Sequence, residues 1–129
     1  MTYEIQIPGK LPGLNDYISA CRTRPQVGAA MKRKAERDVS VFINRTFRGE
    51  RVRCPVVIEY TWYEPNEKRD LDNIASFGMK VIQDALVKCG VLKNDGWKYI
   101  IGFENRFRVD RKDPHITVII KEVAEHTKS

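Results

Sequence analysis

Three aspartates flank one predicted helix. Asp70 and Asp72 stand one residue apart where a strand-like run ends and a helix-like run begins, and Asp95 lies just beyond the glycine expected to end that helix. Hard cations such as Mg²⁺ prefer oxygen ligands and are usually held by one or two carboxylates together with substrate phosphate. Such an ion polarises a phosphoryl group and provides a hydroxide near neutral pH, and a second ion would steady the leaving oxygen. The pattern therefore predicts a metal site for phosphodiester hydrolysis.

Basic residues lie beside these acids and in a second block. The segment 22–53 contains ten Lys and Arg against three acidic residues, although the whole chain carries a formal charge of only +6. A basic block joined to an acidic cluster indicates contact with nucleic acid. We expect phosphate contacts from residues next to the acids and from the first turns of a basic helix: Lys68, Arg69, Lys32, Arg33, Lys34 and Arg37.

The same residues also have purely structural interpretations. Asp72 can cap the helix, Asp70 can pair with Arg69, and Asp95 can shape a turn. The basic helix can equally present a solvated face. His115 and His126 do not indicate a nucleophilic triad, because one begins a predicted strand and the other lies in the C-terminal tail. Both the metal-site and the structural interpretation stay open on the residues alone.

The periodicity of apolar residues predicts an α/β (α+β mixed) domain over residues 1–129. Alternation predicts strands at 2–8, 56–63, 97–107 and 115–123, and helical spacing predicts helices at 29–47 and from Asp72 or Asn73 to a C′ residue at Gly90. Residues 9–15 and 20–26 are placed in loops, 110–114 in a hairpin connection, and 124–129 in a frayed tail. The order β-α-β-α-β-β predicts a mixed sheet packed on two helices.

Cysteine usage and hydropathy indicate a cytoplasmic protein. Cys21, Cys54 and Cys89 are odd in number and lack CxxC spacing, so they predict free thiols in a reducing compartment rather than disulfides or a zinc site. No run of about 18 apolar residues occurs, which predicts a soluble protein without a membrane span.

The segment 68–95 resembles the signature of a known family. Its residues RDLDN, a following helix and DALVKCGVLKND resemble the RusA family of Holliday-junction resolvases, small metal-dependent endonucleases of bacteria and their prophages. Asn15 and Tyr17, after the opening strand and its Pro-rich loop, also resemble the start of that family. The resemblance spans most of the chain, is strong over 68–95 and is weak before residue 56.

The resemblance implies a crossover junction endodeoxyribonuclease that acts in DNA recombination and repair. Asp70, Asp72 and Asp95 would be its catalytic, metal-binding acids, with Mg²⁺ as the ion and Mn²⁺ as a substitute. The resemblance also implies a catalytic lysine on the intervening helix. Counting back from Asp84 selects Lys80, which we favour, whereas counting forward from Asp72 selects Ser76. A homodimer is implied as well, because paired symmetric nicks across a four-way DNA junction match a two-fold axis.

Two other functions stay open. The chain could cut other branched DNA, or it could be a non-catalytic, basic DNA-binding module whose aspartates only structure loops. Trp62, Tyr63, Trp97 and Tyr99 are expected to serve core or dimer contacts rather than to stack on bases.

Overall fold

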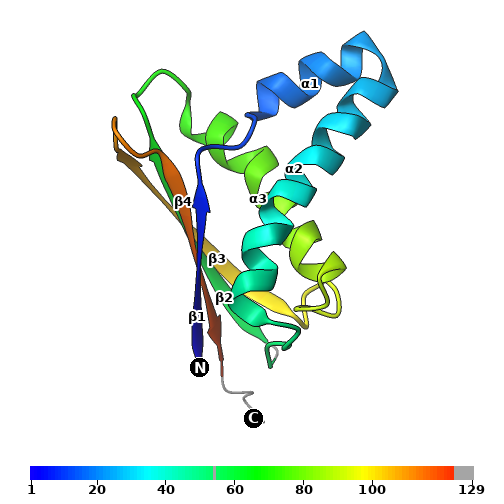
Figure 1. Cartoon of the computed structure of the whole chain (residues 1–129), viewed down its shortest axis with the longest axis vertical. Coiled ribbons are helices and arrows are strands. Elements are labelled where there is room, and N and C mark those ends of the chain that lie inside the picture. The colour runs from blue at the N-terminus through cyan, green and yellow to red at the C-terminus, as the bar shows by residue number, and fades with distance from the viewer. Residues whose placement is uncertain (54, 124–129) are drawn as a thin grey trace.

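The chain folds into a mixed four-stranded sheet with its helices on one side (Figure 1). The structure is a computed structural model that describes residues 1–53 and 55–123. In chain order the elements are β1 (Thr2–Pro8), α1 (Leu14–Thr23), α2 (Pro25–Phe47), β2 (Val56–Glu64), α3 (Leu71–Lys88), β3 (Ile100–Val109) and β4 (His115–Glu122). The predicted α/β class with a mixed sheet is confirmed, although the described residues form three helices rather than two, and α1 packs on α2 and α3. The predictions for Cys54 and for the tail at 124–129 lie outside the described residues.

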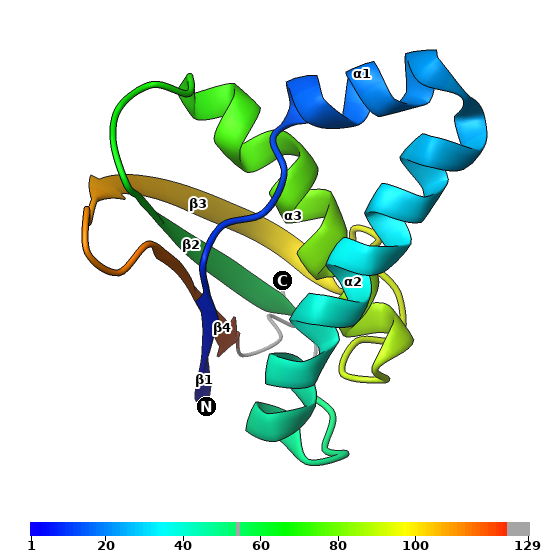
Figure 2. The ribbon, with the colours of Figure 1, turned by 45° about the horizontal axis from the view of Figure 1, so that its top comes forward.

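The sheet is built around β2, whose alternate residues from Val56 to Glu64 are buried. Its neighbours are β3, which is parallel to it, and β4, which is antiparallel. The buried side chains Tyr60 and Trp62 stack with ring centroids 5.6 Å apart and form the middle of the core. Helices cover one face of the sheet and leave the other face open (Figure 2). They therefore bury only the side chains on the covered face, which belong to every second residue of a strand.

The predicted hairpin at 110–114 is wrong. The strand order is β1-β4-β2-β3, so β3 and β4 are not neighbours, and the connection passes from the sheet edge across the end of β2. Two backbone hydrogen bonds hold this crossing in place: Asp110 N donates to Glu64 O (2.8 Å), and Gly9 N donates to Pro114 O (2.8 Å). These bonds join three strand ends at one end of the molecule.

Helix α1 includes residues 14–15 and 20–23, which the sequence analysis wrongly placed in loops. Its N-terminus is stabilised by one hydrogen bond within the same segment and by another to a residue far along the chain. Asp16 Oδ2 accepts the amide of Gly13 (2.8 Å), and Asn73 Oδ1, on α3, accepts the amide of Asn15 (2.8 Å). Local sequence patterns cannot show a hydrogen bond to a residue far along the chain. The segment before α1 is also rich in Pro and Gly, and the sequence analysis therefore did not predict this helix.

Helix α3 packs tightly on the sheet through Gly78. A Cβ at this position would lie 2.6 Å from the Trp62 ring, so only glycine permits this approach. The helix ends as expected at Gly90, whose φ of +77° is suited to glycine. Val91 N donates to Leu86 O and Gly90 N donates to Val87 O (both 3.0 Å), which is the Schellman arrangement. The predicted start was wrong by one or two residues, because α3 begins at Leu71 with Asp70 at the N-cap.

Two of the cysteines, Cys21 and Cys89, are free and half-buried, as the sequence analysis expected. Within the described residues, no helix has both the length and the apolar character needed to cross a membrane.

Candidate functional site

Asp70 and Asp72 project from the start of α3, and both are exposed. Asp70 occupies the N-cap position with extended backbone, yet its side chain makes no capping hydrogen bond. Asp72 Oδ1 accepts only the amide of its neighbour Asn73 (2.9 Å) among the hydrogen bonds of the described residues. Neither carboxylate forms an ion pair with another described residue, so both remain available to a ligand.

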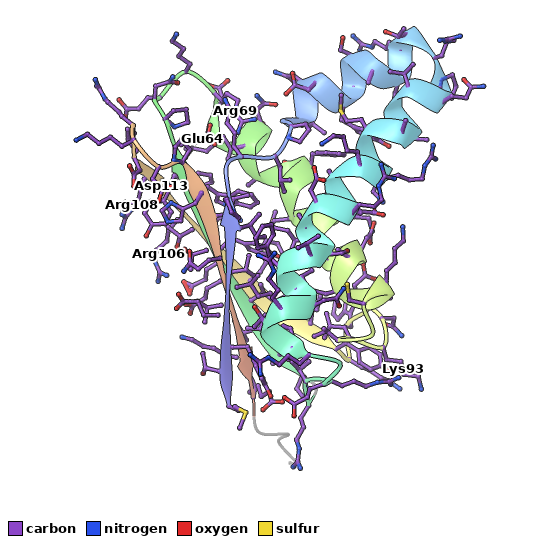
Figure 3. All side chains as sticks on the ribbon, viewed as in Figure 1. Glu64, Arg69, Lys93, Arg106, Arg108 and Asp113 are labelled. Carbon is purple, nitrogen blue, oxygen red and sulfur yellow. The ribbon has the colours of Figure 1, made fainter. Side chains whose placement is uncertain are left out.

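A hollow of about 470 Å³ opens beside Asp70. The segment 64–71 forms one wall and the end of β3 forms the other, with Ile74 beneath. Its lining combines Asp70 with Arg108, while Leu71, Phe107 and Val109 contribute apolar surface. Arg108 borders the hollow from β3, and its side chain lies on the open face of the sheet, on the side of Arg106 (Figure 3).

The side chain of Arg69 is held by hydrogen bonds within the protein, whereas a side chain that contacts phosphate was expected to be free. Its Nε and Nη2 donate to the two carboxylate oxygens of buried Glu64 (2.9 and 2.7 Å), and Nη1 donates to Leu11 O (3.1 Å). Figure 3 shows Glu64 and Arg69 together at the upper end of the molecule. Arg69 therefore ties the end of β2 to the N-terminal loop, and it does not pair with Asp70.

Asp95 lies in the loop after α3 and forms an ion pair with Lys80 of this helix. Lys80 Nζ lies 3.5 Å from Asp95 Oδ2. Lys80 Nζ also lies 3.2 Å from Asp84 Oδ1. These contacts, chiefly the hydrogen bond to Asp84, raise the pKa of Lys80. Lys80 is therefore a fixed positive charge and not a base at neutral pH. Ser76, the alternative position for this lysine, is exposed one helical turn earlier.

Asp84 connects Lys80 to helix α2. Lys32 Nζ reaches Asp84 Oδ2 (2.6 Å) and Glu36 Oε2 (2.8 Å), and Lys88 pairs with the other oxygen of Glu36. Burial would raise the pKa of Glu36, but the hydrogen bonds from Lys32 and Lys88 outweigh it and hold this pKa below its ordinary value. This interhelical ion network, formed by Lys32, Glu36, Lys80, Asp84 and Lys88, fixes α3 against α2 and orients Lys80.

One chain does not bring the three predicted metal ligands together. Over residues 1–53 and 55–123, no group of three or more His, Cys, Asp or Glu side chains is arranged to hold a metal ion. Asp70 and Asp72 share the start of α3, whereas Asp95 contacts Lys80, about 15 Å further along a helix that rises 1.5 Å per residue. The pair can supply the one or two carboxylates that Mg²⁺ commonly uses, but the third ligand does not join them within one chain. A metal ion bound by all three aspartates therefore stays a prediction.

The other predicted phosphate contacts differ in their surroundings. Lys68 is exposed in the loop before Asp70. Lys32 is engaged in the interhelical ion network, and Lys34 pairs with Asp38 (2.8 Å). Arg33 and Arg37 are exposed and line a hollow of about 360 Å³ together with Lys88.

The sequence analysis missed Arg108, which borders the hollow of Asp70 from the end of β3. A basic residue that alternates with apolar residues near the end of a predicted strand gives a weak signal. Only the parallel pairing of β3 with β2, in which Arg108 lies beside Tyr63, shows that the end of β3 reaches the start of α3.

The chain matches no known family model and no curated protein. Function is therefore inferred from this site and from the resemblance over residues 68–95.

Arg69→Met should lower the free energy of unfolding by about 3 kcal/mol, because it leaves the buried carboxylate of Glu64 without its partner. Urea denaturation would measure the change. Replacing both partners, as Glu64→Leu with Arg69→Met, should cost less than Arg69→Met alone, since no buried charge is left unpaired. Lys34→Met, which breaks an exposed ion pair, is the control and should change stability by less than about 1 kcal/mol. Loss of DNA binding by Arg69→Met with unchanged stability would contradict the structural role.

Glu36→Gln should destabilise the protein by about 1–3 kcal/mol at pH 7, because it removes a buried carboxylate from the interhelical ion network. The folded-state pKa of Glu36 is lowered, so its contribution is present above the unfolded-state pKa and disappears as the pH falls through the folded-state value. The stability curves of the parent and the variant should therefore converge below about pH 4. Thermal unfolding between pH 7 and pH 3 tests this, with Asp38→Asn as an exposed control. A gap of constant size would contradict it.

Proposed function

We propose that this protein is a Mg²⁺-dependent endodeoxyribonuclease that resolves four-way DNA junctions by paired symmetric nicks. The observation that carries the proposal is that the carboxylates of Asp70 and Asp72 are exposed and unpaired within the described residues. They stand exposed at the start of α3, Asp70 lines a hollow with Arg108, and neither carboxylate is used in an ion pair within the described residues. The structural alternatives for Asp70, a side-chain cap or a pair with Arg69, are both absent there. The resemblance to the RusA family supplies the substrate.

Each residue of the site has a chemical task in this proposal. Asp70 and Asp72 hold the Mg²⁺ ion, which when bound polarises the scissile phosphate and favours attack by water. Arg108, which borders the same hollow from β3, binds the phosphate backbone. Lys80, kept protonated by Asp84, offers positive charge toward an anionic phosphate rather than accepting a proton.

The basic side chains suggest a path for DNA past this site. Lys68 lies directly before Asp70. A second hollow, of about 510 Å³, lies on the other side of Arg69 and is lined by Lys10 and Lys34. Arg69 borders both hollows, so Arg108 lies on one side of it and Lys10 and Lys34 on the other, although acidic residues line both hollows as well. Phosphate contacts along this path would supply most of the affinity for branched DNA.

A second candidate is a non-catalytic DNA-binding module. The observation that favours it is the separation of Asp95 from Asp70 and Asp72 within one chain. The two candidates share the basic surface and differ in whether the aspartates are needed for strand cleavage.

Asp70→Asn and Asp72→Asn should each reduce cleavage of a synthetic four-way junction by at least about a hundredfold in Mg²⁺, while junction binding is retained. The reason is that each change removes a ligand charge without removing a phosphate contact. Gel analysis of labelled strands would give the rates, and linear duplex of the same sequence would test substrate selectivity.

Asp113→Asn, which changes an exposed carboxylate in the connection at 110–114, is the matched control and should cleave like the parent. Parent protein that binds junctions but never nicks them with Mg²⁺ or Mn²⁺ would exclude the nuclease and leave the binding module. Equal cutting of linear duplex would exclude junction selectivity.

Lys68→Ala and Arg108→Ala should each weaken junction binding several-fold at moderate salt. Because each removes about one phosphate contact, each should also reduce the slope of log K against log [salt] by about 1. Fluorescence anisotropy across a salt series would measure both quantities. Lys121→Ala removes the same charge from the far end of the open sheet face, where Lys121 pairs with Glu59 (2.8 Å), and should leave affinity and slope unchanged. An identical effect of Lys121→Ala would mean that only net charge matters.

A further inference from the structure

The open face of the sheet carries an aromatic pair at the end that lies toward Asp70. Tyr63 of β2 and His115 of β4 are partners in the antiparallel register, and both are half-buried. Their rings stack with centroids 4.1 Å apart and an angle of 11° between the ring planes. Tyr63 alternates with the buried residues of β2 and therefore lies outside the hydrophobic core, on the face that the helices leave open.

The register of the sheet shows which side of this stack is free. Tyr63 pairs with His115 of β4 on one side and with Arg108 of β3 on the other. Because His115 covers one face of the Tyr63 ring, the second face is turned toward Arg108. His115 is held by its Nδ1, which donates to Asp113 O (2.7 Å). Since a carbonyl oxygen only accepts, Nε2 of the neutral ring is an acceptor. The pair thus offers one ring face and one acceptor to a ligand.

Two arginines of β3 lie beside the aromatic pair. Arg106 and Arg108 are exposed, and Figure 3 shows both on the side of the sheet away from the helices. Arg108 Nη1 donates to Phe107 O (3.0 Å), and Arg108 forms no ion pair with another described residue. Arg106 is loosely paired, with its Nη atoms 3.8 Å from Glu59 and 3.9 Å from Glu104. Both guanidinium groups are therefore available to phosphate, which they bind in preference to lone carbonyl groups.

The charges of the open face are divided along the strands. The two rows of paired residues toward Asp70 contain two arginines and no carboxylate: Pro8, His115, Tyr63 and Arg108 in one row, and Gln6, Thr117, Thr61 and Arg106 in the next. The third row contains Glu4, Glu59 and Glu104. In the connection at 110–114, two cations are balanced by two carboxylates. The positive part of the open face therefore coincides with the aromatic pair.

We propose that this end of the open face, formed by Tyr63, His115, Arg106 and Arg108 and here called the stacking patch, binds single-stranded DNA. An unpaired base stacks on the free ring face of Tyr63, and the two guanidinium groups bind neighbouring phosphates. The positive charge of the patch is complementary to a phosphate backbone. The occupant is a single strand because the bases of a duplex are stacked on one another and present no face to an aromatic ring.

The stacking patch adjoins the candidate site. Arg108 belongs to the patch and also borders the hollow of Asp70. A strand that leaves the hollow at Arg108 would therefore pass onto Tyr63, where an unpaired base beside the branch point would be held. This placement rests on the function proposed above, whereas the binding of single strands does not.

Two labelled strands of equal length separate stacking from attraction by charge. One is oligothymidylate, and the other is an abasic strand that keeps the phosphates and lacks the bases. The parent should bind oligothymidylate about tenfold more tightly, because only this strand can stack on Tyr63. Fluorescence anisotropy in EDTA, where no strand is cut, would measure both dissociation constants. Equal affinity for the two strands, or no binding of oligothymidylate at moderate salt, would overturn the stacking patch.

Substitutions assign the preference for bases to Tyr63. Tyr63→Ile should remove it, because isoleucine suits a strand and keeps apolar bulk but has no aromatic face. Tyr63→Phe keeps the ring and should retain the preference. Arg106→Ala should weaken the binding of both strands several-fold, since it removes a phosphate contact. Trp97→Ala removes a 95% exposed indole from the loop before β3 and is the control, which should bind both strands like the parent.

Circular dichroism of each variant would separate loss of binding from loss of fold, and the comparison of the two strands on the parent needs no variant. Folded Tyr63→Ile protein that still prefers oligothymidylate would contradict the stacking patch, as would loss of the preference in Trp97→Ala.

Photocrosslinking tests the placement beside the candidate site. Junctions with one iodouracil at successive positions along the cut strand would be bound by Asp72→Asn protein and irradiated. Crosslinks to Tyr63, identified by mass spectrometry, should be strongest for bases beside the branch point. Crosslinks confined to the ends of the arms would overturn this placement. Because single-strand binding is measured without a metal ion, a parent that never cuts DNA would contradict the proposed function and leave the stacking patch supported by its own result.

Discussion

The buried ion pair between Glu64 and Arg69 is the interaction on which the candidate site depends. Glu64 ends the central strand β2, and its side chain holds Arg69, the residue directly before Asp70. The backbone oxygen of Glu64 accepts the amide of Asp110, and Arg69 also donates to Leu11 O. One buried carboxylate thus joins the end of β2, the start of α3, the N-terminal loop and the connection after β3. Because Arg69 is committed to Glu64, Asp70 is left without a cation and free for a ligand.

The fold was predictable where local patterns and tertiary packing agree. The four strands alternate as their sequence indicates, and Gly90 ends α3 as expected. The predictions that were wrong depend on contacts between residues far apart in the chain. The hydrogen bond from the Asn15 amide near the start of α1 goes to Asn73, far along the chain, and no local pattern indicates it. The short connection at 110–114 suggested a hairpin, but the order β1-β4-β2-β3 places β4 between β1 and β2. Sequential strands are usually neighbours, and β3 and β4 are not.

The position of two of the candidate site residues was predictable, and their surroundings were predictable only in part. Residue types and spacing placed Asp70 and Asp72 correctly at the start of α3, because a helix boundary is a local property. They could not show that Asp95 contacts α3 at Lys80, or that Arg108 borders the hollow of Asp70 from β3. Both relations depend on the pairing and direction of β3. Trp62 is buried in the core, as expected, whereas Trp97 is exposed and its expected role in a dimer contact stays a prediction.

The central claim is that the start of α3 binds a catalytic metal ion. Anomalous X-ray diffraction from crystals of the protein grown with a four-way junction and Mn²⁺ would test it most directly. The account predicts an anomalous peak within about 2.5 Å of carboxylate oxygens of both Asp70 and Asp72, close to a DNA phosphate. Junction-bound crystals with no peak at these residues, or with a peak held by other side chains, would contradict it.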